Sequence, residues 1–200
     1  MKTLKFNFNI TYALAVFMAL ALISCTDNPA DPGEEGPGEE ELITLVELTL
    51  TELDNEGNAT QNETTVTWED EDGPGGNDPV IGTLNLESGK SYSGSIRLLD
   101  TTEEPAEDIT VEVQEEADEH QFFYTVEGSD SDRMFVEVTD QDSNGLPVGL
   151  EYLVTVTDGE ATGLTLNVVL SHYDDSPKDG TTRSDETDVD VDIPVEISVQ

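Results

Sequence analysis

The sequence predicts a mainly β protein whose mature part folds as a two-sheet antiparallel β-sandwich. Apolar side chains alternate with polar ones through most of the chain, a period typical of half-buried strands. The clearest run extends from Val189 to Val199, where every second residue is valine or isoleucine. Turn signals rich in glycine, aspartate and asparagine separate the alternating runs. A regular succession of such strands and turns favours two packed sheets.

The first 24 residues have the composition of a secretory signal peptide. Lys2 and Lys5 form a basic start, an apolar run follows from Tyr12 to Ile23, and a small residue precedes Cys25. The stretch Leu22–Cys25 resembles a bacterial lipobox. The resemblance implies that residues 1–24 are removed and that Cys25 becomes the first residue, carrying acyl chains such as palmitate. Cys25 is the only cysteine, so it is available for lipidation and disulfides are excluded.

A short transmembrane anchor is the alternative for this segment, because its uncharged stretch is close to the ~20 residues that a spanning helix needs. Polar residues weaken its first third, and acidic residues follow it in place of a basic stop-transfer cluster. Thr26 stands where lipoproteins retained at the inner membrane have an aspartate. We therefore expect a lipid-anchored protein of the bacterial outer membrane, with the membrane as a partner through its anchor.

Residues 25–41 are expected to form the acylated cysteine and a disordered acidic tether. From Asn28 to Glu41 the chain reads NPADPGEEGPGEEE, a composition that cannot build a core. An acidic stretch just after the cysteine resembles the surface-export signal of some outer-membrane lipoproteins, so we expect surface exposure. The β-sandwich domain is then expected over residues 42–200, long enough for one core without disulfides or metals.

The chain is strongly acidic, with a formal net charge of −39 that becomes −41 once the two lysines of residues 1–24 are removed. Nucleic acid and anionic lipid need a basic surface, so this charge excludes both as partners. Acidic runs favour solubility as the simplest explanation, and bound cations would relieve the self-repulsion.

Alternation and turn signals predict nine strands in the domain. They are expected at 42–53, 63–69, 80–86, 91–99, 120–127, 133–139, 151–157, 163–172 and 189–199. Short strands with turns every 8–12 residues are typical of an immunoglobulin-like sandwich in architecture. The Cys…Trp…Cys pattern of the true immunoglobulin family is absent, so membership of that family is not supported.

One segment has helical rather than alternating spacing. Ile109, Val113 and Ala117 recur at four-residue steps, and Pro105 is a suitable helix start. The sequence therefore favours one short helix near 106–119, the alternative being a strand through the same segment.

Pro194 interrupts the last strand pattern, and proline cannot donate to a β-ladder. We therefore expect this strand to lie at a sheet edge or to bend there. Asp188, Asp190 and Asp192 are expected on its outward face, where their charge would discourage an exposed edge from pairing with another chain.

The sharpest local motif lies at 140–151, which matches the calcium-loop pattern D-x-[DN]-x-[DN]-G-x₅-E at every specified position. Calcium prefers six to eight oxygen ligands, and this spacing lets them converge on one ion. The expected ligands are Asp140, Asp142, Asn144, the backbone carbonyl of Leu146 and a bidentate Glu151. The pattern resembles an EF-hand loop, but strands rather than helices flank it, so an ordinary polar hairpin loop is the alternative.

A second and weaker calcium candidate consists of Asp70, Asp72, Asn77 and Asp78. No downstream spacing completes its ligand set, so a flexible glycine-rich turn is the alternative. Calcium is the cofactor that these two loops suggest, in a structural role.

The two histidines are the remaining constellation. His120 follows an acidic run, and His172 ends a strand before further acidic residues. Two imidazoles and a carboxylate suit zinc, copper or iron. The sequence does not show whether the two side chains meet, and solvent-exposed histidines are the alternative.

No catalytic pattern is present: neither G-x-S-x-G nor H-E-x-x-H occurs, and Gly89-Lys-Ser lacks the upstream glycine of a P-loop. We therefore expect a protein that is not an enzyme. The first hypothesis is a lipid-anchored binding or accessory module for an outer-membrane receptor or transporter. The alternatives are a transition-metal capture protein using His120 and His172, and a structural or adhesion protein stiffened by calcium loops.

Overall fold

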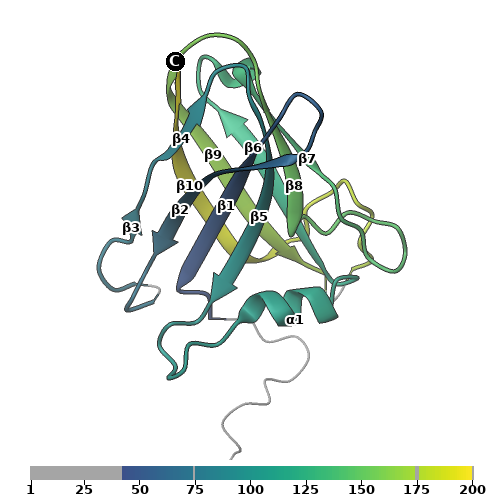
Figure 1. The fold of residues 1–200 in the computed structure, drawn as a ribbon. Coiled ribbons are helices and arrows are strands. Elements are labelled where there is room, and N and C mark those ends of the chain that lie inside the picture. Colours follow the sequence, from purple (N-terminus) through teal and green to yellow (C-terminus); the bar gives the residue numbers. More distant parts are fainter. Residues whose placement is uncertain (1–41, 74, 174–175, 200) are drawn as a thin grey trace, which may run out of the picture. The chain divides into compact units, whose positions relative to one another are not determined.

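A computed structural model describes residues 42–73, 75–173 and 176–199 (Figure 1). The expected signal peptide, the lipidation site Cys25 and the tether lie outside the described residues. The described chain forms two curled sheets, one of six strands and one of four, which confirms the prediction of a mainly β, sandwich-like fold. None of its helices has the length and apolar character that crossing a membrane requires.

The six-stranded sheet is antiparallel throughout. In spatial order it consists of β3 (Val80–Ile81), β2 (Ala59–Glu69), β1 (Leu45–Leu53), β5 (Ser91–Leu99), β8 (Glu151–Val156) and β7 (Met134–Val138). The four-stranded sheet consists of β4 (Leu84–Glu87), β10 (Glu186–Ser198), β9 (Ala161–His172) and β6 (His120–Glu127). Its β4–β10 pair is parallel, which departs from the antiparallel expectation, and its other pairs are antiparallel.

The core lies between the sheets and is built from the alternating apolar positions that predicted the strands. Leu48 and Leu98 from the larger sheet are fully buried, as are Leu166 and Ile193 from the smaller one. In β1, β5 and β10 the polar residues between them face outward, so these strands are buried mainly on one face.

The strand expected at 80–86 is wrong as a single element, because the chain divides there between the two sheets. β3 pairs with β2, whereas β4 pairs with β10. Gly82 lies at the division and donates its N–H to the carbonyl of Thr67 at 2.9 Å. A Cβ at Gly82 would lie 2.9 Å from Cγ2 of Val66, so the close approach of the two segments requires glycine.

The expected helix is confirmed as α1 (Ile109–Glu115), which begins four residues after Pro105. Ile109 and Val113 are buried and Ala117 packs against the core, as the four-residue spacing indicates. Thr110 pins α1 to β5, because its Oγ1 accepts the N–H of Leu98 at 2.8 Å.

The last strand, β10, has an edge over part of its length. β4 pairs with it only from Val195 onward, so among the described residues Glu186–Pro194 has a partner on the β9 side alone. The edge prediction from Pro194 is confirmed for this part. Asp190 and Asp192 are exposed as expected, but the expectation for Asp188 is wrong, because its side chain is 0% exposed.

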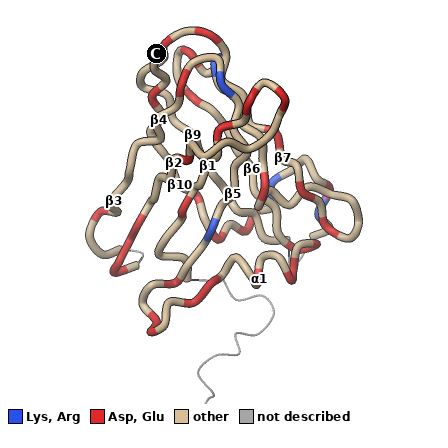
Figure 2. Tube along the Cα trace, in the orientation of Figure 1, with Lys and Arg blue, Asp and Glu red and all other residues tan. Residues whose placement is uncertain are grey.

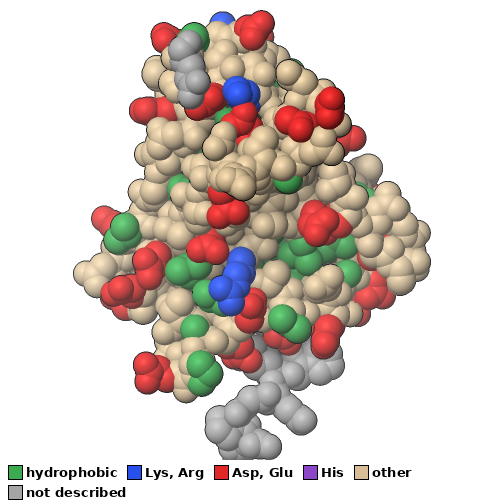
Figure 3. Space-filling model, in the orientation of Figure 1, with side chains coloured by type: hydrophobic (Ala, Val, Ile, Leu, Met, Phe, Trp, Pro, Cys, Tyr) green, Lys and Arg blue, Asp and Glu red, His purple; other side chains and the backbone are tan. Residues whose placement is uncertain are grey.

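Acidic residues are distributed over loops and strands alike (Figure 2). The space-filling view shows them spread over the visible face, with small apolar patches between them (Figure 3). This distribution agrees with the solvated acidic surface that the composition favours.

Candidate metal centre

The two histidines meet at one end of the four-stranded sheet. His120 is the first residue of β6 and His172 is the last residue of β9, and the two are direct partners in the antiparallel ladder. Directly opposed residues have neighbouring side chains. The imidazole rings stack with their centroids 4.3 Å apart and an angle of 22° between their planes.

A β-bulge brings the carboxylate of Asp188 to the histidines. Thr187 pairs with Ser171 and Val189 pairs with Leu170, so Asp188 is the extra residue in β10. Such a residue re-aims its side chain relative to the alternation of the strand. One oxygen of Asp188 lies 3.6 Å from Nε2 of His120, and the other lies 3.5 Å from Nδ1 of His172.

The three side chains come close to the spacing that a shared metal ion requires. One ligand atom from each can be chosen so that all three lie within 4.8 Å of one another. Ligand atoms about 2.0–2.2 Å from one tetrahedral ion lie roughly 3.3–3.6 Å apart, so the longest separation must shorten by up to about 1.2–1.5 Å before all three can bind one ion. Because a ring nitrogen's lone pair lies in the plane of the ring, one of the stacked imidazoles must also turn toward the ion.

The cluster is almost closed to solvent. The side chains of His120 and Asp188 are 0% exposed and that of His172 is 5% exposed. A buried carboxylate requires a positive counter-charge, which either an imidazolium or a metal cation supplies. These are also the only two histidines in 200 residues, and the fold places both beside one buried acid.

The backbone orients His120 for a role as ligand. Its Nδ1 lies 3.1 Å from the carbonyl oxygen of Glu116, just after α1. A carbonyl oxygen only accepts, so Nδ1 carries the proton and donates it. Nε2 is then the atom that faces Asp188, and in a neutral ring it carries the lone pair that a metal needs.

Comparisons of the chain with protein-family models, curated proteins and solved structures found no match. Function is therefore argued from the side chains of the site.

The loop expected to bind calcium holds its acids in internal hydrogen bonds. Asp140 accepts the N–H groups of Gly149 at 2.7 Å and Leu150 at 2.9 Å. Glu151 lies on β8 and its side chain is exposed, so its environment differs from that of the half-buried Asp140. The backbone carbonyl of Leu146 accepts the N–H of Asp142 at 2.8 Å. The structure therefore does not gather this ligand set around one point, and calcium binding here stays a prediction.

Asp142 forms a buried ion pair within the same loop. Its Oδ1 accepts the N–H groups of Asn144 at 2.8 Å and Leu146 at 2.9 Å, and its Oδ2 lies 3.0 Å from Nζ of Lys178. Burial raises the pKa of Asp142, but these amides and the Lys178 ammonium outweigh that effect and hold the pKa below its usual value. In this structure the positive charge beside Asp142 is therefore the ammonium group of Lys178.

The weaker calcium candidate is an internally bonded turn. Oδ2 of Asp72 accepts both the N–H of Asn77 at 3.1 Å and the side-chain amide of Asn77 at 2.7 Å. Asp70 is buried and Asp78 is exposed, so their environments differ. The described residues hold no metal-ligand cluster at this turn, and calcium binding here also stays a prediction.

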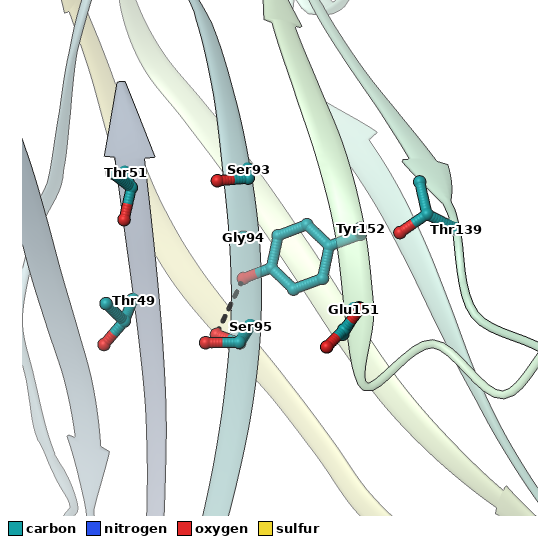
Figure 4. A pocket seen from close by; sticks show the side chains of 8 residues that line it. All are labelled: Thr49, Thr51, Ser93, Gly94, Ser95, Thr139, Glu151 and Tyr152. Carbon is teal, nitrogen blue, oxygen red and sulfur yellow. Dashed lines mark hydrogen bonds between the residues drawn. The ribbon is translucent and has the colours of Figure 1, made fainter. Parts of the chain in front are cut away.

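A shallow depression of about 250 Å³ lies on the outer face of the six-stranded sheet (Figure 4). Hydroxyl side chains and one carboxylate surround it, and Tyr152 lies beneath it. Its lining consists of Thr49, Thr51, Ser93, Gly94, Ser95, Thr139, Glu151 and Tyr152. The hydroxyl of Tyr152 donates to the carbonyl of Ser95 at 3.4 Å.

Gly94→Ala is expected to destabilise the protein by about 1–3 kcal/mol, the usual cost of overpacking a core. The reason is that a Cβ at Gly94 would overlap the ring of Tyr152, which is 2% exposed. Urea unfolding measures the loss, and Ser93→Ala on the exposed face of the same strand is the control, with almost no change expected. Equal stability of Gly94→Ala and the unsubstituted protein would contradict the packing described.

Asp188 is the residue of the candidate site that sequence reasoning missed. In the sequence it keeps step with Asp190 and Asp192, which places it on the outward face. Only the bulge in β10 turns it inward, and nothing in the sequence signals that bulge.

Proposed function

We propose that this protein is a lipid-anchored protein of the bacterial outer membrane whose domain captures a transition-metal ion, zinc above others, through His120, His172 and Asp188. The observation that carries the proposal is the convergence of the chain's only two histidines on a buried carboxylate. Imidazole and carboxylate ligands suit zinc, which imposes no geometry through its d electrons and tolerates an irregular site.

The proposed role is binding rather than catalysis. Catalytic zinc sites keep a ligand position open to water or substrate. Here the three side chains are 0–5% exposed, which supports a site that holds its ion. The strongly acidic surface supports the same role, because it raises the local concentration of cations around the protein.

Zinc binding is tested with the chain from residue 25, carrying Cys25→Ser so that it stays free of lipid. After EDTA treatment, zinc, copper and calcium are added separately and thermal unfolding is followed. One zinc per chain is expected to raise the melting temperature by several degrees, since a ligand at 100 times its Kd adds about 2.7 kcal/mol. The gain is expected to disappear in His120→Ala and in His172→Ala. An unchanged melting temperature with every transition metal would refute the proposal.

The location rests on the lipobox-like stretch Leu22–Cys25 and on the acidic tether after it. Expressed with its full leader, the protein is expected in the outer-membrane fraction, and Cys25→Ser is expected to move it to the soluble fraction, because acyl chains supply the membrane affinity. Ser24→Ala, which keeps a small residue before the cysteine, is the control and is expected to remain membrane-bound. Membrane retention of the Cys25→Ser protein would contradict lipid anchoring.

A second function, the binding or accessory module for an outer-membrane receptor or transporter, is favoured by the edge of the six-stranded sheet. β3 carries Val80, which is 72% exposed, and Ile81, which is 41% exposed. Exposed apolar edges offer a surface for a protein partner. Val80→Asp/Ile81→Asp is expected to abolish co-purification with a membrane partner, and equal recovery of that partner would count against this role.

The immunoglobulin-like character of the sandwich is likewise a proposal. Two facing sheets with short turns support it, whereas the parallel β4–β10 pair is a departure from a purely antiparallel arrangement.

A further inference from the structure

Lys178 is a buried lysine that joins three segments of the chain. Its ammonium donates to the backbone carbonyl of Ala117 at 2.7 Å and lies 3.0 Å from Oδ2 of Asp142. The side chains of Lys178 and Asp142 are 2% and 1% exposed. Ala117 follows α1, Asp142 lies between β7 and β8, and Lys178 itself precedes β10. Such a buried pair is strongly held once both charges have partners.

The segment that Lys178 holds is the one that supports the metal ligands. Glu116, next to Ala117, accepts the Nδ1 proton of His120. Glu119 accepts the N–H of Tyr173 at 2.8 Å, and Tyr173 directly follows His172. Residues 116–119 therefore bridge the ends of the two strands that carry the histidines. Lys178 binds this bridge through the backbone carbonyl of Ala117.

An ion can enter or leave this centre only when the structure opens locally, because its ligands are almost completely buried. An opening that moves residues 116–119 away from β9 must break the bond between Lys178 and Ala117. It would also separate a buried ammonium from one of its two partners, which is costly.

We propose that Lys178 is a latch that controls the exchange of the metal ion, an inference that rests on the proposed function. Lys178 touches no ligand atom and acts through residues 116–119. If the bonds of Lys178 seen in this structure also persist in the loaded protein, their loss changes the rates of binding and release together. The affinity of the site, which depends on His120, His172 and Asp188, stays nearly constant.

The test loads the chain with zinc and follows transfer to an excess of chromophoric chelator. Lys178→Met is expected to release zinc about 10–100-fold faster, the factor that corresponds to one lost hydrogen bond to a charged group. Association is expected to accelerate by a similar factor, leaving the Kd within about threefold. Lys178→Met/Asp142→Asn also removes the unpaired acid, so it keeps the test available if the single variant folds poorly, and it is expected to release zinc equally fast.

Arg97→Met is the matched control. It removes an ion pair to Asp108, 2.8 Å long, at the opposite end of α1 and far more exposed, with the Arg97 side chain 52% exposed. Zinc release from Arg97→Met is expected to match that of the unsubstituted protein. Release from Lys178→Met at the rate of this control would overturn the latch, and so would a rise in Kd that accounts for the whole change in rate.

Failure of the metal site and failure of the latch are separable. If the unsubstituted chain binds no zinc, the proposed function fails. The latch is then judged in the metal-free protein from hydrogen exchange at the amide of Tyr173, which donates to Glu119. Faster exchange in Lys178→Met than in Arg97→Met shows that Lys178 holds residues 116–119 to β9 even without a metal, and equal exchange overturns the latch.

Discussion

Asp188→Asn is expected to weaken zinc binding by at least about 100-fold, more than the loss of a second-shell partner. The carboxylate would supply the negative charge of the proposed ligand set, and it lies 3.6 Å from one imidazole and 3.5 Å from the other. An amide of the same size offers a neutral oxygen, so the positive charge of the ion would not be sufficiently neutralised in a site closed to water. Competition with a chromophoric chelator measures the affinity.

Asp190→Asn is the matched control for this experiment. It makes the same change of charge two residues along β10, on a side chain that faces solvent and accepts the amide of Asn167 at 2.7 Å. Its zinc affinity is expected to stay within about twofold, because an exposed charge is screened by salt. Equal losses of zinc affinity in both variants would mean that the negative charge of the whole protein attracts the ion. The cluster of His120, His172 and Asp188 would then lose its proposed role.

Asp142→Asn is expected to destabilise the domain by about 3–5 kcal/mol at neutral pH, the range found when one partner of a buried ion pair is removed. The variant leaves the Lys178 ammonium 2% exposed and without its carboxylate. Chemical denaturation at pH 7 measures the loss. Asp140→Asn, which removes no ion pair, is the comparison, and a smaller loss is expected there because its partners are backbone amides.

The same pair predicts how the difference depends on pH. The pKa of Asp142 is lowered in the folded protein from the ordinary value of 3.8, so its stabilising effect is fully present above that value. The effect is lost as the pH falls below 3.8 through the folded pKa, because the unfolded chain then binds the proton first. The stability difference between the unsubstituted protein and Asp142→Asn is therefore expected to be constant from pH 7 to about pH 5 and to shrink below pH 4. A difference that grows on acidification would contradict this assignment.

Strands and helix were predictable because each is a local consequence of side-chain order. Alternation places Leu166 and Ile193 on one face of their strands whatever the rest of the chain does, and that face is buried. Four-residue spacing likewise indicated α1 through Ile109 and Val113. The prediction of a single strand at 80–86 was wrong because the chain divides at Gly82, and that division depends on which segment packs against Gly82.

The candidate metal centre was only partly predictable. Composition and chemistry single out His120 and His172 as the residues suited to a transition metal, and the calcium pattern at 140–151 is read from spacing alone. Whether the ligands converge is a different question. The acids of that loop bond to nearby amides and to Lys178, a residue 36 positions away, which no spacing rule contains.

What the sequence by itself determined is the alternation that makes the domain a β protein, its acidic composition and the resemblance of Leu22–Cys25 to a lipobox. These properties depend on residues close together in the chain. The tertiary structure alone decided that His120 and His172 face each other, through the register of β6 and β9. It also decided that Asp188 joins them, because one extra residue in β10 reverses the direction of a side chain and the pairing of distant strands sets where that residue falls.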